Sequence, residues 1–235
     1  MKHTADSNFL NYERPSLATD LVLFRIKDNH DKRYINKALQ VQLIKRNTEP
    51  FINKWSLSGA FVNIDETIEE AIKSKVFKKS GYNNVYLEQL FTFDEIDRDP
   101  RWRVIGVSYI GILNSNENNI SETKSEWFNV TDIGLVSESG TVINFNDFEN
   151  ELAFDHGTIL KLAIERLRNK IFYTDIAFNF ISENFTIREL QDTFEAILNK
   201  KINNFHRTMK DKIVETGDIM QGQAYRPAKY YKKNF

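Results

Sequence analysis

Residues 74–82, SKVFKKSGY, carry three lysines at the end of a segment with the apolar spacing of an amphipathic helix. Lys75, Lys78 and Lys79 are spaced i, i+3 and i+4, so a helix places them on one face. Such a face is either a solvated basic surface or a site for phosphate or another anion, because a lysine ammonium binds phosphate as a point charge. The sequence leaves both interpretations open.

The residues around these lysines, GAFVNIDETIEEAIKSKVFKKSGY, resemble the Nudix box, whose pattern is G-x5-E-x7-R-E-U-x-E-E-x-G-U with U apolar. Ala60 takes the place of the first glycine, Glu66 that of the first glutamate and Ser74 that of the arginine. The three lysines take the places of the three catalytic glutamates. Gly81 and Tyr82 fall on the closing pair, so the frame of the motif is kept while its carboxylates are not.

This change removes the chemistry that the resemblance implies. Nudix hydrolases hold Mg²⁺ or Mn²⁺ with those glutamates and activate water against a diphosphate. A lysine ammonium has no lone pair for a metal, and three of them repel a divalent cation. Glu66 alone matches a family carboxylate, whereas Glu69 and Glu70 do not. We therefore expect no catalytic residues, no metal and no cofactor, with a hydrolase of ADP-ribose or another nucleoside diphosphate derivative as the alternative.

Longer segments extend the resemblance over residues 11–235. NYERPSLATDLVLF, NVYLEQLFTFDEIDRDPRWRVIGVSYIGIL, ELAFDHGTILKLAIERLRNKIFYTDIAFNFI and FTIRELQDTFEAILNKKINNFHRTM are similar to segments of the NrtR family, the Nudix-related transcriptional regulators of NAD metabolism. This resemblance implies a homodimeric repressor that binds double-stranded operator DNA. It also implies a Nudix-like sensor domain whose effector is ADP-ribose or a related metabolite, or a sugar in other branches.

Charge is divided unevenly along the chain. The whole sequence of 235 residues has a net charge of −1, but residues 152–235 carry +4 and residues 199–235 carry +6. An acidic first part and a basic end predict two domains with different partners. The sequence has no cysteine, no membrane-length apolar run and no secretory signal, so we expect a cytoplasmic protein with no membrane partner.

The element pattern agrees with an α+β chain of two domains. Strands are expected near residues 17–27, 37–46, 84–96 and 102–113, with helices over 65–81 and from 155 onward. A capping box, Thr186 with Glu189, predicts a helix over 186–199; a second helix over 203–213 and a hairpin around Gly217 and Gly222 follow, which is the order of a winged helix-turn-helix. We expect a Nudix-like α/β/α sandwich in residues 1–150, a connecting helix in 151–172 and the winged helix in 173–235.

Cations and aromatic rings are the candidates for ligand binding. DRDPR places two arginines in a tight turn, where they either flank the turn or reach a ligand phosphate as a fork. Trp55 and Phe61 either stack on a base or belong to the core, and Lys45 and Arg46 either face the pocket or solvent. The expected ligand-binding residues are Lys45, Arg46, Trp55, Phe61, Lys75, Lys78, Lys79, Arg98 and Arg101.

The expected recognition helix, INNFHRTMKDK, alternates polar residues with an apolar face of Phe205, Met209 and Ile213. Asparagine and arginine hydrogen-bond base edges, while lysine mainly neutralises phosphate. A basic end can also be only a solvated surface. The expected DNA-binding residues are Thr186, Arg188, Asn203, Asn204, His206, Arg207, Lys210, Arg226 and Lys229, with Lys232 and Lys233 just after the wing.

The segment LAFDHG opens the long helix that joins the two expected domains. Asp155 is predicted to be its N-cap, accepting backbone N–H groups. His156 is either a structural histidine or a signal between the domains. The position of the helix over residues 155–171 suggests that it transmits the state of the sensor to the winged helix.

Overall fold

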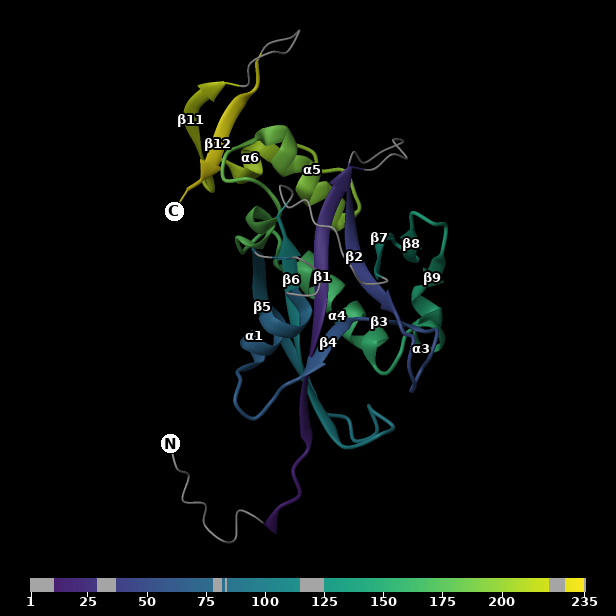
Figure 1. The fold of residues 1–235 in the computed structure, drawn as a ribbon. Helices are drawn as coiled ribbons and strands as arrows, with labels where there is room; N and C mark the ends of the chain where they lie inside the picture. Colours follow the sequence, from purple (N-terminus) through teal and green to yellow (C-terminus); the bar gives the residue numbers. More distant parts are fainter. Residues whose placement is uncertain are drawn as a thin grey trace.

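The computed structural model describes residues 11–28, 37–77, 82, 84–114, 125–219 and 227–234. A large sheet with its helices forms the first part of the chain, and a small helical unit with a protruding hairpin follows it (Figure 1). Within the described residues, no helix is long and apolar enough to cross a membrane.

The first part is built on a nine-stranded sheet. Its strands follow the order β5-β6-β1-β2-β7-β8-β9, with β3 beside β2 and β4 beside β1. Their bounds are β1 Ser16–Asp28, β2 Lys37–Lys45, β3 Trp55–Ser56, β4 Ser58–Phe61, β5 Val85–Phe93, β6 Val104–Leu113, β7 Ser125–Val130, β8 Gly134–Ser137 and β9 Val142–Asn144.

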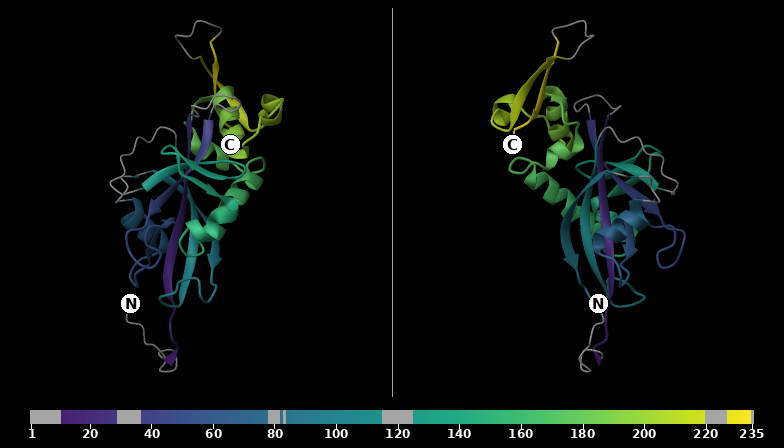
Figure 2. Two further views of the ribbon diagram at one scale, coloured as in Figure 1. Left: turned by 90° about the vertical axis from the view of Figure 1, so that its right-hand side faces the viewer. Right: turned by 60° about the vertical axis from the view of Figure 1, so that its left-hand side comes forward.

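Strand β1 lies at the centre of the sheet and separates two cores. Side chains alternate along a strand, so Val22 and Phe24 enter the core that contains α4 (His156–Lys170), while Leu21 and Leu23 enter the core with Ile72. The helices α1 (Ile68–Ala71) and α4 thus cover opposite faces of the sheet (Figure 2). This layering is the expected α/β/α sandwich.

The helix of the altered Nudix box differs from the expectation. Instead of one α-helix over residues 65–81, α1 is a single capped turn that continues as the π-helix η2 (Ile72–Phe77). Thr67 and Glu70 form a reciprocal capping box at its start. A 3.6-residue apolar pattern does not distinguish the wider π turn. Lys78, Lys79 and Gly81 lie outside the described residues.

The winged-helix order is present in the last part of the chain. The helix α3 (Phe148–Glu151) precedes α4. The elements that follow α4 are the short 3-10 helix η4 (Ile176–Phe180), β10 (Phe185–Thr186), α5 (Ile187–Leu198), α6 (Phe205–Met209), β11 (Ile213–Ile219) and β12 (Lys229–Lys233). The three strands form a second sheet in the order β10-β12-β11. A second short 3-10 helix, η3 (Phe145–Asp147), lies directly before α3.

The recognition helix was expected over residues 203–213 and is shorter. α6 spans only Phe205–Met209, because Asn204 takes the left-handed conformation at φ 56° and the chain turns again after Met209. Asparagine adopts this conformation more readily than most residues, which suits it to a helix start of this kind. The predicted core positions Phe205, Met209 and Ile213 are confirmed as buried.

One apolar core runs through both parts of the chain. The cluster that contains Phe24 and Val41 of the sheet also contains Phe194 of α5 and Phe205 of α6. The Nε of Arg168, near the end of α4, donates to the carbonyl of Ile197 in α5 at 3.1 Å. The winged helix is therefore packed onto the sheet rather than tethered by a linker. The domain boundaries expected at residues 150 and 172 stay predictions.

This shared core predicts that the two parts unfold together. The ring of Phe194 is fully buried, with its centroid 5.6 Å from Phe172 and 5.0 Å from Phe205. Phe194→Ala should lower the free energy of unfolding by about 3–5 kcal/mol. All three tryptophans, at positions 55, 102 and 127, lie in the first part, so tryptophan fluorescence should report the same lowered urea midpoint as far-UV circular dichroism.

Tyr173→Ala serves as the control, because that side chain is 70% exposed and its loss should leave both midpoints in place. A tryptophan midpoint that stays unchanged in Phe194→Ala while the dichroism midpoint falls would show that the winged helix unfolds separately.

Candidate functional site

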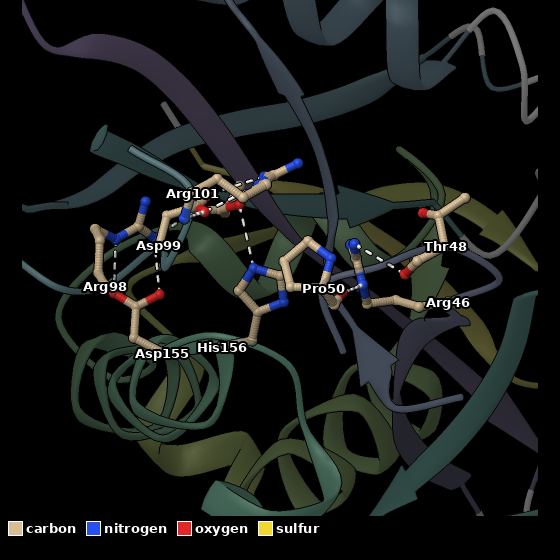
Figure 3. Close-up of polar contacts among 9 residues, drawn as sticks. Arg46, Thr48, Pro50, Arg98, Asp99, Arg101, Asp155 and His156 are labelled. Atoms are coloured by element: carbon tan, nitrogen blue, oxygen red, sulfur yellow. Dashed lines mark hydrogen bonds and ion pairs between the residues drawn. The ribbon is translucent and has the colours of Figure 1, made fainter. Parts of the chain in front are cut away.

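A cavity of about 290 Å³ opens beside the altered Nudix box. Its walls come from β1, β4, the turn between β5 and β6, and the first residues of α4. These segments are far apart in sequence but meet where β4 pairs with the start of β1, with Thr19 opposite Ala60 and Asp20 opposite Gly59. Figure 3 shows the polar side chains that converge there.

Two guanidinium groups and two phenyl rings form the mouth of the cavity. Arg46 lies 4.9 Å from the ring centroid of Phe154, and Arg101 lies 5.7 Å from the rings of both Phe61 and Phe154. The Nε of Arg46 donates to a backbone carbonyl, and Arg101 pairs with Asp99 at 2.7 Å. Desolvation and then the charge of Arg101 lower the pKa of Arg46, so the two cations face a shared space.

The floor of the cavity is a buried ionic cluster. Arg98 donates through Nε and Nη2 to both oxygens of Asp155 at 2.8 Å, and its Nη2 also reaches Asp20 at 3.0 Å. The Nδ1 of His156 accepts from the amide of Leu57 at 3.0 Å, and its Nε2 lies 3.4 Å from Asp20. With Nδ1 occupied as an acceptor, the proton of a neutral ring sits on Nε2 and points toward Asp20.

The cluster fixes the charge on Asp20. Burial raises the pKa of this carboxyl, but the hydrogen bond from His156 and the charge of Arg98 outweigh it and leave the pKa below its ordinary value. The side chain of Arg98 is only 5% exposed. A buried cation of this kind needs its carboxylate partners, because an unpaired charge inside a protein is strongly destabilising.

Two glycines make room for this cluster. A β-carbon at Gly106 would lie 2.5 Å from a guanidinium nitrogen of Arg98, and one at Gly59 would lie 2.8 Å from the backbone carbonyl oxygen of Thr19 and 2.9 Å from the carboxylate of Asp20. Both positions are inside strands, where glycine packs nothing and weakens the element. Close approach of Arg98 explains Gly106, and close approach of the β1 backbone together with the Asp20 carboxylate explains Gly59.

A buried hydroxyl also lines the cavity. Thr19 is 1% exposed, and its Oγ1 has no hydrogen-bond partner among the described residues. Leaving a buried hydroxyl unsatisfied is costly, by about 1–3 kcal/mol. Because side chains alternate along β1, this hydroxyl points to the face of the sheet opposite the carboxylate of Asp20.

The remaining family carboxylate of the Nudix box is neutralised within the chain. Glu66 forms an ion pair with Lys75, whose Nζ also donates to the carbonyl of Phe61 at 2.7 Å. The hydrogen bond from Lys75 holds the pKa of Glu66 below its ordinary value. Among the described residues, no group of three or more histidine and carboxylate side chains is placed to hold a metal ion. This donor set does not fit the divalent cation of a Nudix hydrolase.

The structure brings together four of the nine expected ligand residues. Arg46, Phe61, Arg98 and Arg101 line the cavity. Trp55 does not: it is 8% exposed and packs edge-on against Phe128 at 4.9 Å. Lys45 is exposed and lies 5.4 Å from the ring of Trp55, Lys75 lies beside the cavity in its ion pair, and Lys78 and Lys79 fall outside the described residues.

The prediction for Asp155 is corrected. It occupies the N-cap position of α4 but makes no side-chain cap hydrogen bond, because both of its oxygens accept from Arg98. Sequence reasoning also missed Thr19, Asp20 and Phe154. A signal existed only for Asp20, a lone acid inside the apolar strand LATDLVLF.

The expected DNA-binding residues gather around α6 and the hairpin. Asn203, Asn204, His206, Arg207 and Lys210 are exposed, and neither Arg207 nor Lys210 forms an ion pair with a described residue. Three others are engaged within the chain: Thr186 is a buried helix cap, Arg188 pairs with Asp192, and Lys229 pairs with Glu215. Lys232 is exposed and Lys233 pairs with Asp175, while Arg226 lies outside the described residues.

Comparison with known proteins agrees with this architecture. Residues 177–232 match the family of NrtR DNA-binding winged helix domains. The chain is 28% identical over 230 residues, 94% of its length and 83% of the relative, to the ADPR responsive transcriptional repressor NtrR of Acinetobacter baylyi.

Two crystal structures are similar over almost the whole chain. A MutT/nudix family protein from Enterococcus faecalis has a TM-score of 0.77 and 27% identity, with 100% of this chain and 95% of that chain covered. Shewanella oneidensis NrtR complexed with a 27mer DNA has a TM-score of 0.65 and 28% identity, with 93% of each chain covered. The predictions of a Nudix-like sandwich, of a C-terminal winged helix and of a resemblance to NrtR regulators are confirmed.

An enzyme is also among the relatives. The chain is 29% identical over 152 residues, 64% of its length and 73% of the relative, to the ADP-ribose pyrophosphatase of Methanocaldococcus jannaschii. This match is shorter than the match to the repressor.

The ionic cluster predicts a specific pH dependence of stability. Because the folded-state pKa of Asp20 lies below its ordinary value of 3.8, the charged carboxylate stabilises the fold above that pH and loses this effect as the pH falls through the folded-state pKa. Asp20→Asn should lower the free energy of unfolding at pH 7 by about 3–5 kcal/mol. Urea unfolding of the wild type and Asp20→Asn between about pH 7 and pH 3 should show that the difference between their free energies of unfolding becomes smaller toward pH 3.

The exposed Asp65 supplies the control, since Asp65→Asn should track the wild type at every pH. If the difference in the free energy of unfolding between the wild type and Asp20→Asn does not change with pH, the charge of Asp20 does not stabilise the fold.

Proposed function

We propose that this chain, which has the winged helix and the whole-chain architecture of the NrtR regulators, is a DNA-binding transcriptional repressor that senses ADP-ribose. The observation that carries the proposal is the combination of a basic winged helix with a cationic cavity in a Nudix-like frame, where Lys75 pairs with Glu66. The repressor would work as a homodimer in the cytoplasm, on an operator of two half-sites.

The winged helix supports DNA binding. Arg207 and Lys210 project from the exposed side of α6, whose other side is fixed in the core by Phe205 and Met209. The curated relative matched over the whole chain is a repressor, and the NrtR crystal structure contains DNA. Exposed cations on a rigid helix suit contacts with phosphates and base edges.

The cavity supports ADP-ribose as the effector. Its diphosphate needs cations, which Arg46 and Arg101 supply at the mouth. Its ribose hydroxyls can donate to a carboxylate, which Asp20 supplies in the floor. The relative from Acinetobacter baylyi is named as responsive to the same compound.

We also propose that the chain is not a hydrolase. Lys75 takes a catalytic glutamate position and binds the only matching carboxylate, Glu66. The pyrophosphatase relative keeps hydrolysis of ADP-ribose as the second candidate. Magnesium-dependent release of ribose phosphate from ADP-ribose at a turnover of about 1 s⁻¹ or more would contradict the proposal.

The two arginines at the mouth should set effector affinity. Isothermal titration of ADP-ribose, without divalent cations, should show binding by the wild type and about 10- to 100-fold weaker binding by Arg101→Ala and Arg46→Ala, because each loses a charge-assisted hydrogen bond. The control is Lys73→Ala, since this lysine is 63% exposed on the side chain and points away into a surface ion pair. Equal affinity in all four proteins would remove the cavity as the effector site.

Arg207 should contribute to DNA affinity. Duplexes bound by the wild type can be selected from a random library and their affinity measured by fluorescence anisotropy. Arg207→Ala should bind about tenfold more weakly, and loss of a phosphate contact should reduce the slope of log affinity against log salt by about 1. The matched control is Lys161→Ala, an exposed lysine on α4 of the sensor. No selected duplex at all, or an unchanged slope, would count against the assignment.

A further inference from the structure

We propose that three consecutive residues, Phe154, Asp155 and His156, couple the cavity to the winged helix through α4. The inference rests on the proposed function and assigns to these residues the step that links effector binding to DNA release. All three belong to the cavity wall or its ionic floor, and they are also the entrance to α4.

Each of the three side chains is held by a different part of the cavity. The ring of Phe154 packs edge-on against Phe51 at 4.8 Å and lies beneath the guanidinium of Arg46. Both carboxylate oxygens of Asp155 accept hydrogen bonds from Arg98 (Figure 3). His156 is fixed by the amide of Leu57. A ligand that enters the cavity must contact or displace the partners of this segment.

The backbone of the segment is held in an unfavourable conformation. Phe154 has a φ of 54°, in the left-handed region that a bulky residue seldom adopts. Such a conformation costs about 1–3 kcal/mol and persists only where the surroundings hold it. The surroundings here are the ring contacts of Phe154 and the fork from Arg98 to Asp155. Loosening either would release the first turn of α4.

Arg98 connects the segment to the mouth of the cavity. It lies in the same turn as Asp99 and Arg101, so an anion that moves Arg101 pulls on the chain that carries Arg98. Gly106 leaves no free space behind the guanidinium. Movement of the turn is therefore passed to Asp155 rather than absorbed by a void.

The far end of α4 meets the DNA-binding part. Ile159, Ala163 and Leu167 are buried along the helix in the core that continues into α5. Arg168, one turn before the end, donates to the carbonyl of Ile197 in α5. A helix packed this tightly moves as a unit, so a shift at residues 154–156 changes the placement of α5 and of α6 beyond it.

Asp155→Asn tests the coupling, because it keeps the size of the side chain while weakening the ionic grip. In the wild type, saturating ADP-ribose should lower the affinity for a selected 27-base-pair duplex by about tenfold or more. In Asp155→Asn, with ADP-ribose at a concentration that saturates the variant, we expect ligand-free duplex affinity within about threefold of wild type but a ligand effect below about threefold. Asp155→Glu, which keeps the charge, should restore part of the effect.

Hydrogen exchange gives a readout that needs no DNA. ADP-ribose should change amide protection in α4 and in residues 187–198 of the wild type, while in Asp155→Asn the change should stop at the cavity.

Arg168→Gln tests the other end of α4 and leaves the cavity intact, so it can replace Asp155→Asn if that variant does not fold. It should bind ADP-ribose normally and also lose the effect on DNA. Glu165→Gln, an exposed change on the same helix, is the control.

The outcomes separate the two proposals. A wild-type protein that binds neither ADP-ribose nor any duplex overturns the proposed function, and the coupling with it. Normal coupling in both Asp155→Asn and Arg168→Gln, with both ligands bound, overturns the coupling alone. Loss of ADP-ribose binding in Asp155→Asn would make Asp155 a ligand residue and would also overturn its coupling role.

Discussion

The guanidinium of Arg98 is buried between two carboxylates, Asp155 at the start of α4 and Asp20 in the central strand. This ionic contact joins the turn that carries the pocket arginines, the middle of the sheet and the long helix. Removing the guanidinium of Arg98 from water is unfavourable, and this cost is compensated only while both carboxylates are in place. The glycine at position 106 leaves room for the guanidinium, since a β-carbon there would lie 2.5 Å from one of its nitrogens.

The continuous apolar core connects this ionic contact to the winged helix. In a chain with a flexible linker, a change in the sensor would reorient nothing beyond it. Here β2 and α4 pack directly against α5, so the sensor and the winged helix form one packed body. The core transmits displacement because close-packed interiors shift between discrete arrangements rather than deform continuously.

The altered Nudix box keeps the local structure that holds its helix against the sheet. Thr67 still caps the helix and Ile72 and Val76 still anchor it against the sheet. The lysine that stands in a glutamate position meets the remaining glutamate, so positive charge on the chain replaces the metal's role of neutralising a carboxylate. Among the described residues, the cations at the mouth of the cavity, Arg46 and Arg101, come from other segments.

The sequence by itself determined the α+β fold class, the winged-helix order and the core face of α6, because these depend on local periodicity, capping and residue type. It also identified Arg46, Phe61, Arg98 and Arg101. Only the tertiary structure decided that Trp55 is core, that Asp155 binds Arg98 instead of capping its helix, and that Thr19, Asp20 and Phe154 complete the cavity. Those roles depend on which distant segments meet, since a side chain binds the nearest partner in space and periodicity carries no information about that partner.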